Sequence, residues 1–276
     1  MKFTKMHGCG NDYVYVDCFR ETVADPNDLA RRIADRHFGV GGDGLVLICP
    51  TEGADAFMRM FNQDGSEGDM CGNAIRCVAK YVYEHGVIAP ERRTAVINTR
   101  AGLRETALTV EDGVVTAVTV DMGAPALTSE LPEAITVRGM ALSFVGVDAG
   151  SKHAAYYLAD NPALGADDPS ALRLGDYGPD FETHPRFPDR VNSEFVRVLN
   201  RGEIAFRVWE RGSGETLACG TGATAAVYAG IRLGRLDDDV LVHLTGGDLR
   251  IRYDAATGHC FMTGPAVEVF TGDFPV

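Results

Sequence analysis

The chain has 276 residues, of which 45% are hydrophobic and 24% charged, a composition typical of globular proteins and not of disordered ones. At roughly 100–200 residues per domain, this length predicts two domains or one large one. The 26 basic and 39 acidic residues give a net charge of −13, which argues against nucleic acid as a partner because its phosphate backbone is also negative.

No apolar run reaches the ~18 residues that a membrane helix needs, and the charged N-terminus has no apolar secretory segment behind it. The sequence contains seven cysteines, an odd number. Disulfides are rare in the reducing cytosol. We therefore expect a cytoplasmic protein with free thiols and no membrane partner.

The predicted elements are short strands punctuated by Gly and Pro. Alternating apolar patterns predict strands at 13–16, 45–48, 114–120 and 204–208. Three segments are predicted to be helices. The first follows Asp25, a capping residue, with Pro26 at its first position.

The second helix is predicted from about Asn73 to His85 and the third from about Thr221 to Leu233, each followed by a glycine. They begin alike, with Cys71-Gly72-Asn73 and Cys219-Gly220-Thr221 after Gly-rich acidic turns. The two starts lie about half the chain apart. This pattern predicts an internal duplication into two similar domains, with a boundary near residues 112–125.

A cysteine at a helix N-terminus has a defined chemistry. The unpaired N–H groups and the positive end of the helix dipole lower the pKa of a thiol and can also hold a carboxylate. Two such starts facing one substrate would place a thiolate and a thiol on opposite sides of it. This arrangement suits inversion of a carbon next to a carboxylate, where a base takes a proton from one face and an acid returns one to the other.

Four of the remaining cysteines are interpreted as small apolar residues: Cys18, Cys49, Cys77 and Cys260. Cys9 lies in a Gly-rich loop, and its role is left open. Cys71 and Cys77 have no nearby Cys or His to complete a tetrahedral site, so we expect no metal.

Four blocks of sequence, spread over nearly the whole chain, resemble the diaminopimelate epimerase family of cofactor-independent enzymes. They are Lys5-Met6-His7-Gly8-Cys9-Gly10-Asn11-Asp12, residues 61–77 around Cys71, residues 190–196 around Asn192, and residues 210–223 around Cys219.

The resemblance implies an α+β fold of two pseudo-symmetric domains, 1–116 with the final strand 264–276 and 117–263. Each domain is expected to wrap a curved, mostly antiparallel sheet around a central helix, with the active site in the cleft between the domains. The implied activity is interconversion of LL- and meso-diaminopimelate in lysine and cell-wall precursor biosynthesis, without a cofactor. A homodimer and a small amino-acid substrate are also implied.

The resemblance assigns roles to individual residues. Cys71 and Cys219 match the catalytic acid and base, and His153 and Glu210 match groups that tune thiol pKa values. The positions that match substrate contacts are Asn11, Gly44, Asn62, Gly72, Asn73, Ser151, Asn192, Glu210, Arg211, Gly220 and Thr221. At position 44 relatives often have Gln, so a glycine there offers only its backbone.

The chain departs from the family pattern in two places. Ala74 replaces a glycine after Cys71-Gly72-Asn73, and Gly150-Ser151-Lys152-His153 replaces the usual Gly-Asn-Pro-His. Ser151 has a shorter reach than Asn, and Lys152, interpreted as a solvent-facing charge, brings a cation near the site. These changes bear on the substrate's side chain and leave the chemistry at the α-carbon intact.

Other functions stay open at this point. A racemase of another amino acid, of the histidine or proline type, would use the same cysteine pair. A thiol redox sensor would use the pair as a reversible disulfide. A pyridoxal-phosphate racemase needs a Schiff-base lysine, and the chain has only four lysines, of which Lys152 lies between the candidate site residues Ser151 and His153. A simple binding module would leave the paired cysteines unexplained.

Overall fold

The computed structural model describes residues 1–275 and divides into two compact units. The first contains Met1–Val120 and the chain from Thr263 onward, and the second contains Asp121–Met262. Two strands, β8 (Val114–Gly123) and β18 (His259–Gly264), carry the chain across the boundary between the units. Each unit is described separately below.

The first unit is a mixed sheet in which most neighbours are antiparallel. Its further strands are β1 (Lys2–Gly8), β2 (Asn11–Asp17), β3 (Gly44–Cys49), β4 (Ala56–Asn62), β5 (Glu67–Gly68), β6 (Thr94–Thr99), β7 (Gly102–Glu111) and β19 (Val267–Asp273). They pair in the order β19, β1, β2, β3, β4, β6, β7 and β8, with β5 on β4. Only β2–β3 and β4–β6 are parallel.

The second unit repeats this plan. Its strands are β9 (Ala126–Leu127), β10 (Glu133–Val137), β11 (Met140–Asp148), β12 (Lys152–Tyr157), β13 (Asn192–Asn200), β14 (Glu203–Glu210), β15 (Gly214–Glu215), β16 (Asp239–Leu244) and β17 (Gly247–Asp254). The pairs β12–β13 and β14–β16 are parallel, and β11–β12, β13–β14 and β16–β17 are antiparallel.

The two units therefore share one order of pairings. In each, a parallel pair, an antiparallel pair, a second parallel pair and a second antiparallel pair follow one another, and a two-residue strand precedes the long helix. This repetition confirms the α+β fold and the internal duplication that the sequence predicts.

The three predicted helices are present, with bounds within one residue of those expected: α1 (Pro26–Ile33), α2 (Gly72–Glu84) and α4 (Gly220–Arg232). Asp25 caps α1 by accepting a hydrogen bond from the Asp28 backbone N–H (3.0 Å). A fourth helix, α3 (Leu174–Glu182), was not predicted, because Gly175, Gly178 and Pro179 hide its periodicity. Single 3-10 turns occupy Leu158–Asp160, Pro162–Leu164 and Pro169–Ala171.

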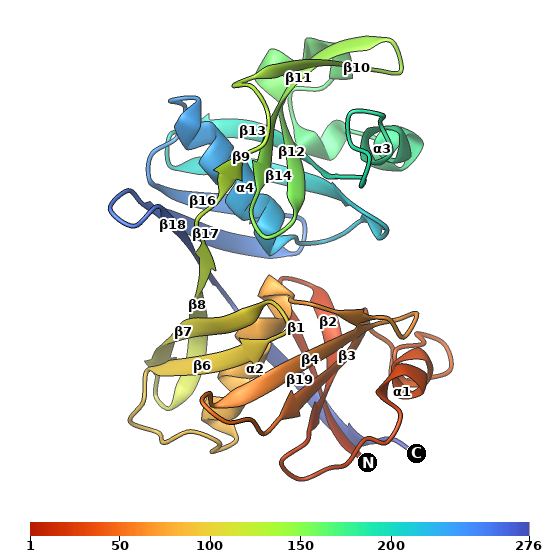
Figure 1. Cartoon of the computed structure of the whole chain (residues 1–276), viewed down its shortest axis with the longest axis vertical. Coiled ribbons are helices and arrows are strands. Elements are labelled where there is room, and N and C mark those ends of the chain that lie inside the picture. Colours follow the sequence, from red (N-terminus) through yellow and green to blue (C-terminus); the bar gives the residue numbers. More distant parts are fainter. Residues whose placement is uncertain (276) are drawn as a thin grey trace. The chain divides into compact units, whose positions relative to one another are not determined.

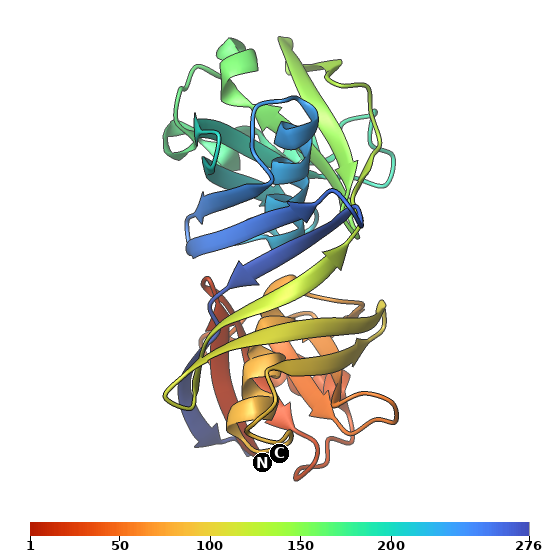
Figure 2. The same ribbon diagram turned by 90° about the vertical axis from the view of Figure 1, so that its left-hand side faces the viewer.

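A curved sheet wraps around one long helix in each unit, α2 in the first and α4 in the second (Figure 1; Figure 2). Helix α2 contacts strands β1, β2, β4, β6 and β7, and α4 contacts β11, β12, β13 and β17. Every α2 residue from Gly72 to Tyr83 is buried. Burial on all sides fixes the direction of each helix, and with it the position of the cysteine at its start.

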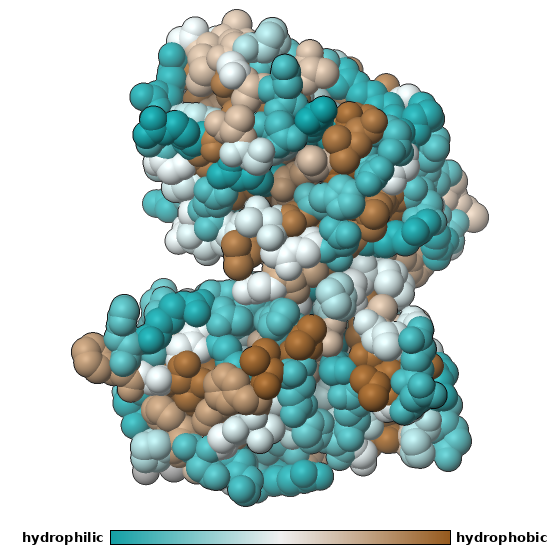
Figure 3. All heavy atoms as spheres, turned by 180° about the vertical axis from the view of Figure 1, so that it is seen from behind, coloured by the Kyte–Doolittle hydropathy of each residue, from teal (hydrophilic) through white to brown (hydrophobic). Residues whose placement is uncertain are grey.

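On the face drawn in Figure 3, hydrophilic residues predominate and apolar residues reach the surface in separate patches. The most exposed large apolar side chain is Phe38, at 92%. Among the described residues, none of the helices has the length and apolar character that crossing a membrane would require.

Candidate active site

Cys71 is the N-cap of α2, where the chain turns from an extended conformation into the helix. Its sulfur accepts a hydrogen bond from the Ala74 backbone N–H (3.4 Å), and its thiol donates to Asn11 Oδ1 (3.4 Å). The side chain is partly exposed. The thiol thus lies at the positive end of the helix, beside backbone N–H groups that can bind a carboxylate.

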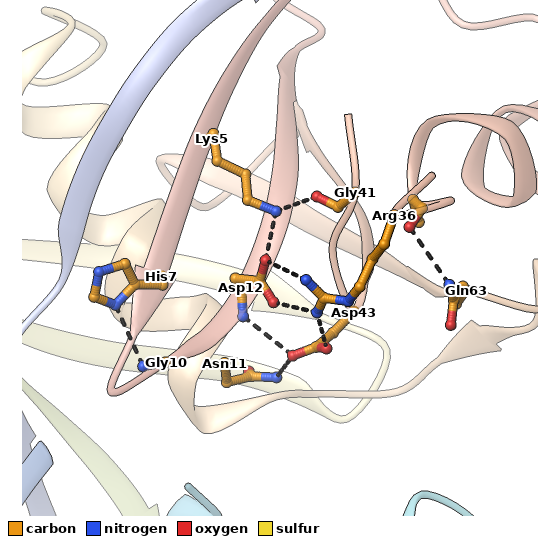
Figure 4. A network of polar contacts seen from close by, with 10 residues as sticks. Lys5, His7, Gly10, Asn11, Asp12, Arg36, Gly41, Asp43 and Gln63 are labelled. Carbon is orange, nitrogen blue, oxygen red and sulfur yellow. Dashed lines mark hydrogen bonds and ion pairs between the residues drawn. The ribbon is translucent and has the colours of Figure 1, made fainter. Parts of the chain in front are cut away.

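Asn11 is held in place by a network of charged side chains (Figure 4). Its Nδ2 donates to Asp43 Oδ2 (2.7 Å), which also accepts from the Asp12 backbone N–H (3.1 Å). Arg36 bridges Asp12 (2.7 Å) and Asp43 (2.9 Å), and Lys5 pairs with Asp12 (2.6 Å). Because the amide nitrogen is fixed by Asp43, the amide oxygen is left to face Cys71.

Gly44 and Asn62 are direct partners in the pairing of β3 with β4. A Cβ at position 44 would lie 1.9 Å from the carbonyl oxygen of Phe61, so this backbone accepts only glycine. Asn62 is exposed and donates from Nδ2 to Ser66 Oγ (2.9 Å). The structure therefore explains why no glutamine can occupy position 44 on this backbone.

A fully buried guanidinium, Arg76, braces the start of α2. It donates to the Gly72 carbonyl (3.1 Å), to Asn73 Oδ1 (2.9 Å) and to the Pro265 carbonyl (3.1 Å). The Asn73 side chain is thereby engaged inside the protein. Arg76 lies in a block that resembles the family, but its bracing role was not predicted.

Cys219 is the N-cap of α4 and, unlike Cys71, is buried, with 5% of its surface exposed. Burial raises the pKa of Cys219 well above the ordinary thiol value, and the charge of Glu210 raises it further. A hydrogen bond with Thr221 and the Gly222 N–H act in the opposite direction. The prediction of a lowered thiol pKa is therefore wrong for Cys219, because enclosure and carboxylates outweigh the helix terminus.

A chain of hydrogen bonds leads from Cys219 to a buried carboxyl group. Thr221 Oγ1 lies 3.5 Å from Cys219 Sγ and accepts from Ser151 Oγ (3.4 Å). Ser151 Oγ is 2.8 Å from His153 Nε2, and His153 Nδ1 is 2.7 Å from Glu194 Oε1. Ser151 thus contacts His153, whereas the resemblance implies a contact with substrate, and Glu194 was not predicted at all.

Both ends of the His153–Glu194 pair are fully buried. Burial lowers the pKa of His153 to about 4, against the opposing charge of Glu210. Burial also raises the pKa of Glu194 well above its ordinary value, and the charge of Glu210 adds to this effect. Burial thus favours the uncharged form of both groups, which share a hydrogen bond.

The two loops beside Cys219 are joined through Asn192. Its Nδ2 donates to the Lys152 carbonyl (2.9 Å), and its Oδ1 accepts from the Arg211 backbone N–H (2.9 Å). Glu210 accepts a hydrogen bond from Thr216 Oγ1. Lys152 forms an exposed ion pair with Asp189 (2.7 Å), which agrees with its interpretation as a solvent-facing charge.

The predicted site residues therefore fall into two groups, one in each unit, and each group includes the cysteine at the start of a central helix. The first group is Asn11, Gly44, Asn62, Cys71, Gly72 and Asn73, and the second is Ser151, His153, Asn192, Glu210, Arg211, Cys219, Gly220 and Thr221. Within residues 1–275, no group of three or more His, Cys, Asp or Glu side chains is arranged to hold a metal ion.

Known proteins match this chain over its full length. The family model for diaminopimelate epimerase matches residues 3–128 and 145–269. A diaminopimelate epimerase from Acetivibrio thermocellus is 47% identical over 284 residues, covering 99% of this chain and 98% of the relative. One from Agathobacter rectalis is 48% identical, covering 100% of both.

Solved structures share the fold at low sequence identity. A probable proline racemase from Agrobacterium radiobacter K84 superimposes with a TM-score of 0.74 and 17% identity, covering 100% of this chain and 93% of that one. A hydroxyproline epimerase from Agrobacterium vitis superimposes with a TM-score of 0.71 and 18% identity, covering 99% of this chain and 91% of that one. Together with the full-length sequence matches, this shows that the chain is an isomerase that belongs to the diaminopimelate epimerase family.

Proposed function

We propose that the protein interconverts LL- and meso-diaminopimelate by moving protons between the substrate's α-carbon and two cysteines. The observation that carries this proposal is the repeated arrangement of a cysteine N-cap at the start of the central helix in both halves of the chain. Full-length matches to diaminopimelate epimerases support the choice of substrate.

The α-carboxylate is proposed to bind the backbone N–H groups of Gly72, Asn73, Gly220 and Thr221. These lie in the first turns of α2 and α4, where N–H groups have no partner inside the helix. Removal of the α-proton pushes negative charge onto this carboxylate. The positive helix ends stabilise that charge most strongly in the transition state, which is the condition for catalysis.

The two thiols are proposed to take complementary states. Burial and Glu210 favour the protonated form of Cys219, so Cys219 is suited to donate a proton while Cys71 removes one from the opposite face. In the reverse direction the roles exchange. Both sulfurs must reach one α-carbon, so we propose that the units close around the substrate and exclude water.

In the reverse direction Cys219 is proposed to gain support from the hydrogen-bond chain behind it. If neutral Glu194 donates to His153 Nδ1, His153 carries its proton on Nε2 and donates to Ser151. Ser151 then donates to Thr221, and the Thr221 hydroxyl is free to donate to the sulfur. Every donor points toward Cys219, so the chain stabilises its thiolate without bringing in a full charge.

The far end of the substrate is proposed to bind Arg211. A guanidinium binds a carboxylate through two parallel hydrogen bonds, and Asn192 fixes the backbone of this residue. Both catalytic thiols must stay reduced, which supports a cytoplasmic setting.

The test is solvent exchange with a panel of substrates. The reduced protein is incubated in heavy water with LL-diaminopimelate, L-histidine or L-proline, and the α-proton signal is followed by NMR. We expect exchange with diaminopimelate alone, and none with the Cys71→Ala or Cys219→Ala variants as matched controls. Exchange of histidine or proline without exchange of diaminopimelate would overturn the proposed substrate.

A further inference from the structure

We propose that Cys18 and Cys49 form a redox-active dithiol, which a hydroperoxide converts to a disulfide, at a site separate from both helix starts. From the sequence these two residues are interpreted only as small apolar residues. The inference does not depend on the proposed epimerase reaction.

The strand pairing places the two cysteines side by side. β2 and β3 run parallel, in register from Tyr13 beside Gly44 to Asp17 beside Ile48. The Cys18 backbone N–H donates to the Ile48 carbonyl (2.9 Å), which continues the pairing one step and brings Cys18 next to Cys49. Neighbouring strands lie about 4.8 Å apart, and disulfides join Cα atoms about 4.4–6.8 Å apart.

The two side chains also lie on the same face of the sheet. Both pack against the core cluster that contains Val16 and Leu47, each of which lies two residues before the cysteine on its segment. Both thiols are free and partly exposed to solvent. A small oxidant can therefore reach two cysteines that lie on neighbouring strands and on one face of the sheet.

The pair is chemically asymmetric. The adjacent Cys18 thiol lowers the pKa of Cys49, and the nearby Arg59 guanidinium lowers it further. In turn, the adjacent Cys49 thiol, followed by burial, raises the pKa of Cys18. Since the thiolate is the nucleophile, Cys49 is the sulfur that attacks and Cys18 is the one that resolves the product.

The reaction balances with one hydroperoxide. The Cys49 thiolate attacks the terminal oxygen of ROOH, the O–O bond breaks, and Cys49 sulfenic acid and ROH result after one proton is taken up. The Cys18 thiol then attacks the sulfenic sulfur, forming the S–S bond and releasing water. The two thiols are oxidised by two electrons, and the hydroperoxide is reduced by two.

The site is distant from the candidate active site along the same strands. Asn11 begins β2 and Gly44 begins β3, whereas the two cysteines lie at the other ends. At the rise of a β-strand, the separation is about 17 Å from Gly44 to Cys49 and about 23 Å from Asn11 to Cys18. The disulfide should therefore leave epimerase turnover unchanged. It also closes a loop in the chain, which restricts the unfolded state and should raise the midpoint of thermal unfolding.

The test maps the link in the full chain. Reduced protein is treated with tert-butyl hydroperoxide, remaining thiols are alkylated, and trypsin with Asp-N separates Cys18 from Cys9. We expect mass spectrometry to find residues 17–20 joined to residues 43–54 with the loss of two hydrogens. We expect the link to raise the unfolding midpoint and dithiothreitol to reverse both effects.

Two single variants test the assignment of roles, and both should keep epimerase activity. In the Cys18→Ser variant, dimedone should trap a sulfenic acid on Cys49. In the Cys49→Ser variant, dimedone should label Cys18 about tenfold more slowly than it labels Cys49 in the first variant. Cys260 is the unreactive internal control, because burial raises the pKa of its thiol to about 12. Recovery of both cysteines as alkylated thiols, faster labelling of Cys18, or oxidation of Cys49 without the link would each overturn the proposal.

Discussion

The starts of α2 and α4 share one backbone plan but have opposite electrostatic surroundings. Five residues after each cysteine, a buried side chain donates to the carbonyl that follows the cysteine: Arg76 to Gly72 (3.1 Å) and Thr224 to Gly220 (2.9 Å). In the first unit this donor is a cation. In the second it is a neutral hydroxyl, and the negative charge of Glu210 raises the pKa of Cys219.

This difference shows how a duplicated fold can supply two unlike acid–base groups. The helix terminus is common to both cysteines, so it cannot distinguish them. Residues from other strands make the distinction: Asn11 contacts Cys71, whereas Glu210 and the Glu194–His153 pair surround Cys219. The duplication provides the geometry, and the neighbours set the preferred protonation state.

The largest effect should come from removing either thiol. Cys71→Ala and Cys219→Ala should each lower the rate of diaminopimelate inversion by roughly 10³-fold or more, because a proton can then move on one face only. Coupled assays or NMR would measure the rate. Near-normal inversion by either variant would show that the two helix starts do not act on one carbon.

The next prediction compares the third position after each cysteine. A Cβ at Gly222 would lie 2.9 Å from Glu194 Oε1 and 3.2 Å from Cys219 Sγ. Gly222→Ala should displace the sulfur and lower kcat by about 10–100-fold. The matched change Ala74→Gly should keep kcat and cost about 1 kcal/mol of stability from helix propensity alone. Equal kcat in the two variants would contradict the tighter packing assigned to Cys219.

The two buried donors should differ in their contribution to stability. Arg76→Met leaves buried oxygens of Gly72, Asn73 and Pro265 without their donor, and should cost about 3–5 kcal/mol. Thr224→Val removes one hydrogen bond and should cost about 1 kcal/mol. Urea unfolding of both variants measures the loss of unfolding free energy. A larger loss in Thr224→Val than in Arg76→Met would contradict the prediction.

The smallest predicted effect is a change in pH dependence. Glu194 has a raised folded pKa, so its contribution to stability is complete below its unfolded value and is lost as the pH rises. His153 has a folded pKa of about 4, so its contribution is complete above 6.5 and is lost as the pH falls. Above pH 4.5 and below 6.5, as long as folded Glu194 keeps its proton, the folded and unfolded pairs hold equal numbers of protons and the two contributions cancel.

Glu194→Gln removes one side of this balance. The variant should lose stability as the pH falls from 6.5 to 4.5, by up to about 1.4 kcal/mol per pH unit relative to the wild type. Urea unfolding at pH 5 and pH 7 would measure the difference. A constant difference at the two pH values would show that Glu194 is ionised in the folded protein.

Local patterns in the sequence predicted the central helices, their cysteine caps and the duplication, because capping and periodicity depend on neighbouring residues. The helix α3 was missed because Gly178 and Pro179 disfavour a helix that packing nevertheless stabilises. Glu194 lies 41 residues from His153 and Asp43 lies 32 from Asn11, so no local signal connects them. The raised pKa of Cys219 depends on enclosure, which periodicity does not report.

The central claim is that two separate sulfurs serve opposite faces of the substrate, and early isotope distribution tests it directly. LL-diaminopimelate is incubated with the reduced enzyme in heavy water, and product and remaining substrate are analysed before equilibrium. Two bases predict deuterium at the inverted carbon of the meso product, while the recovered LL isomer keeps its protons. Deuterium entering the recovered LL isomer as fast as the product would indicate a single base and would contradict the account.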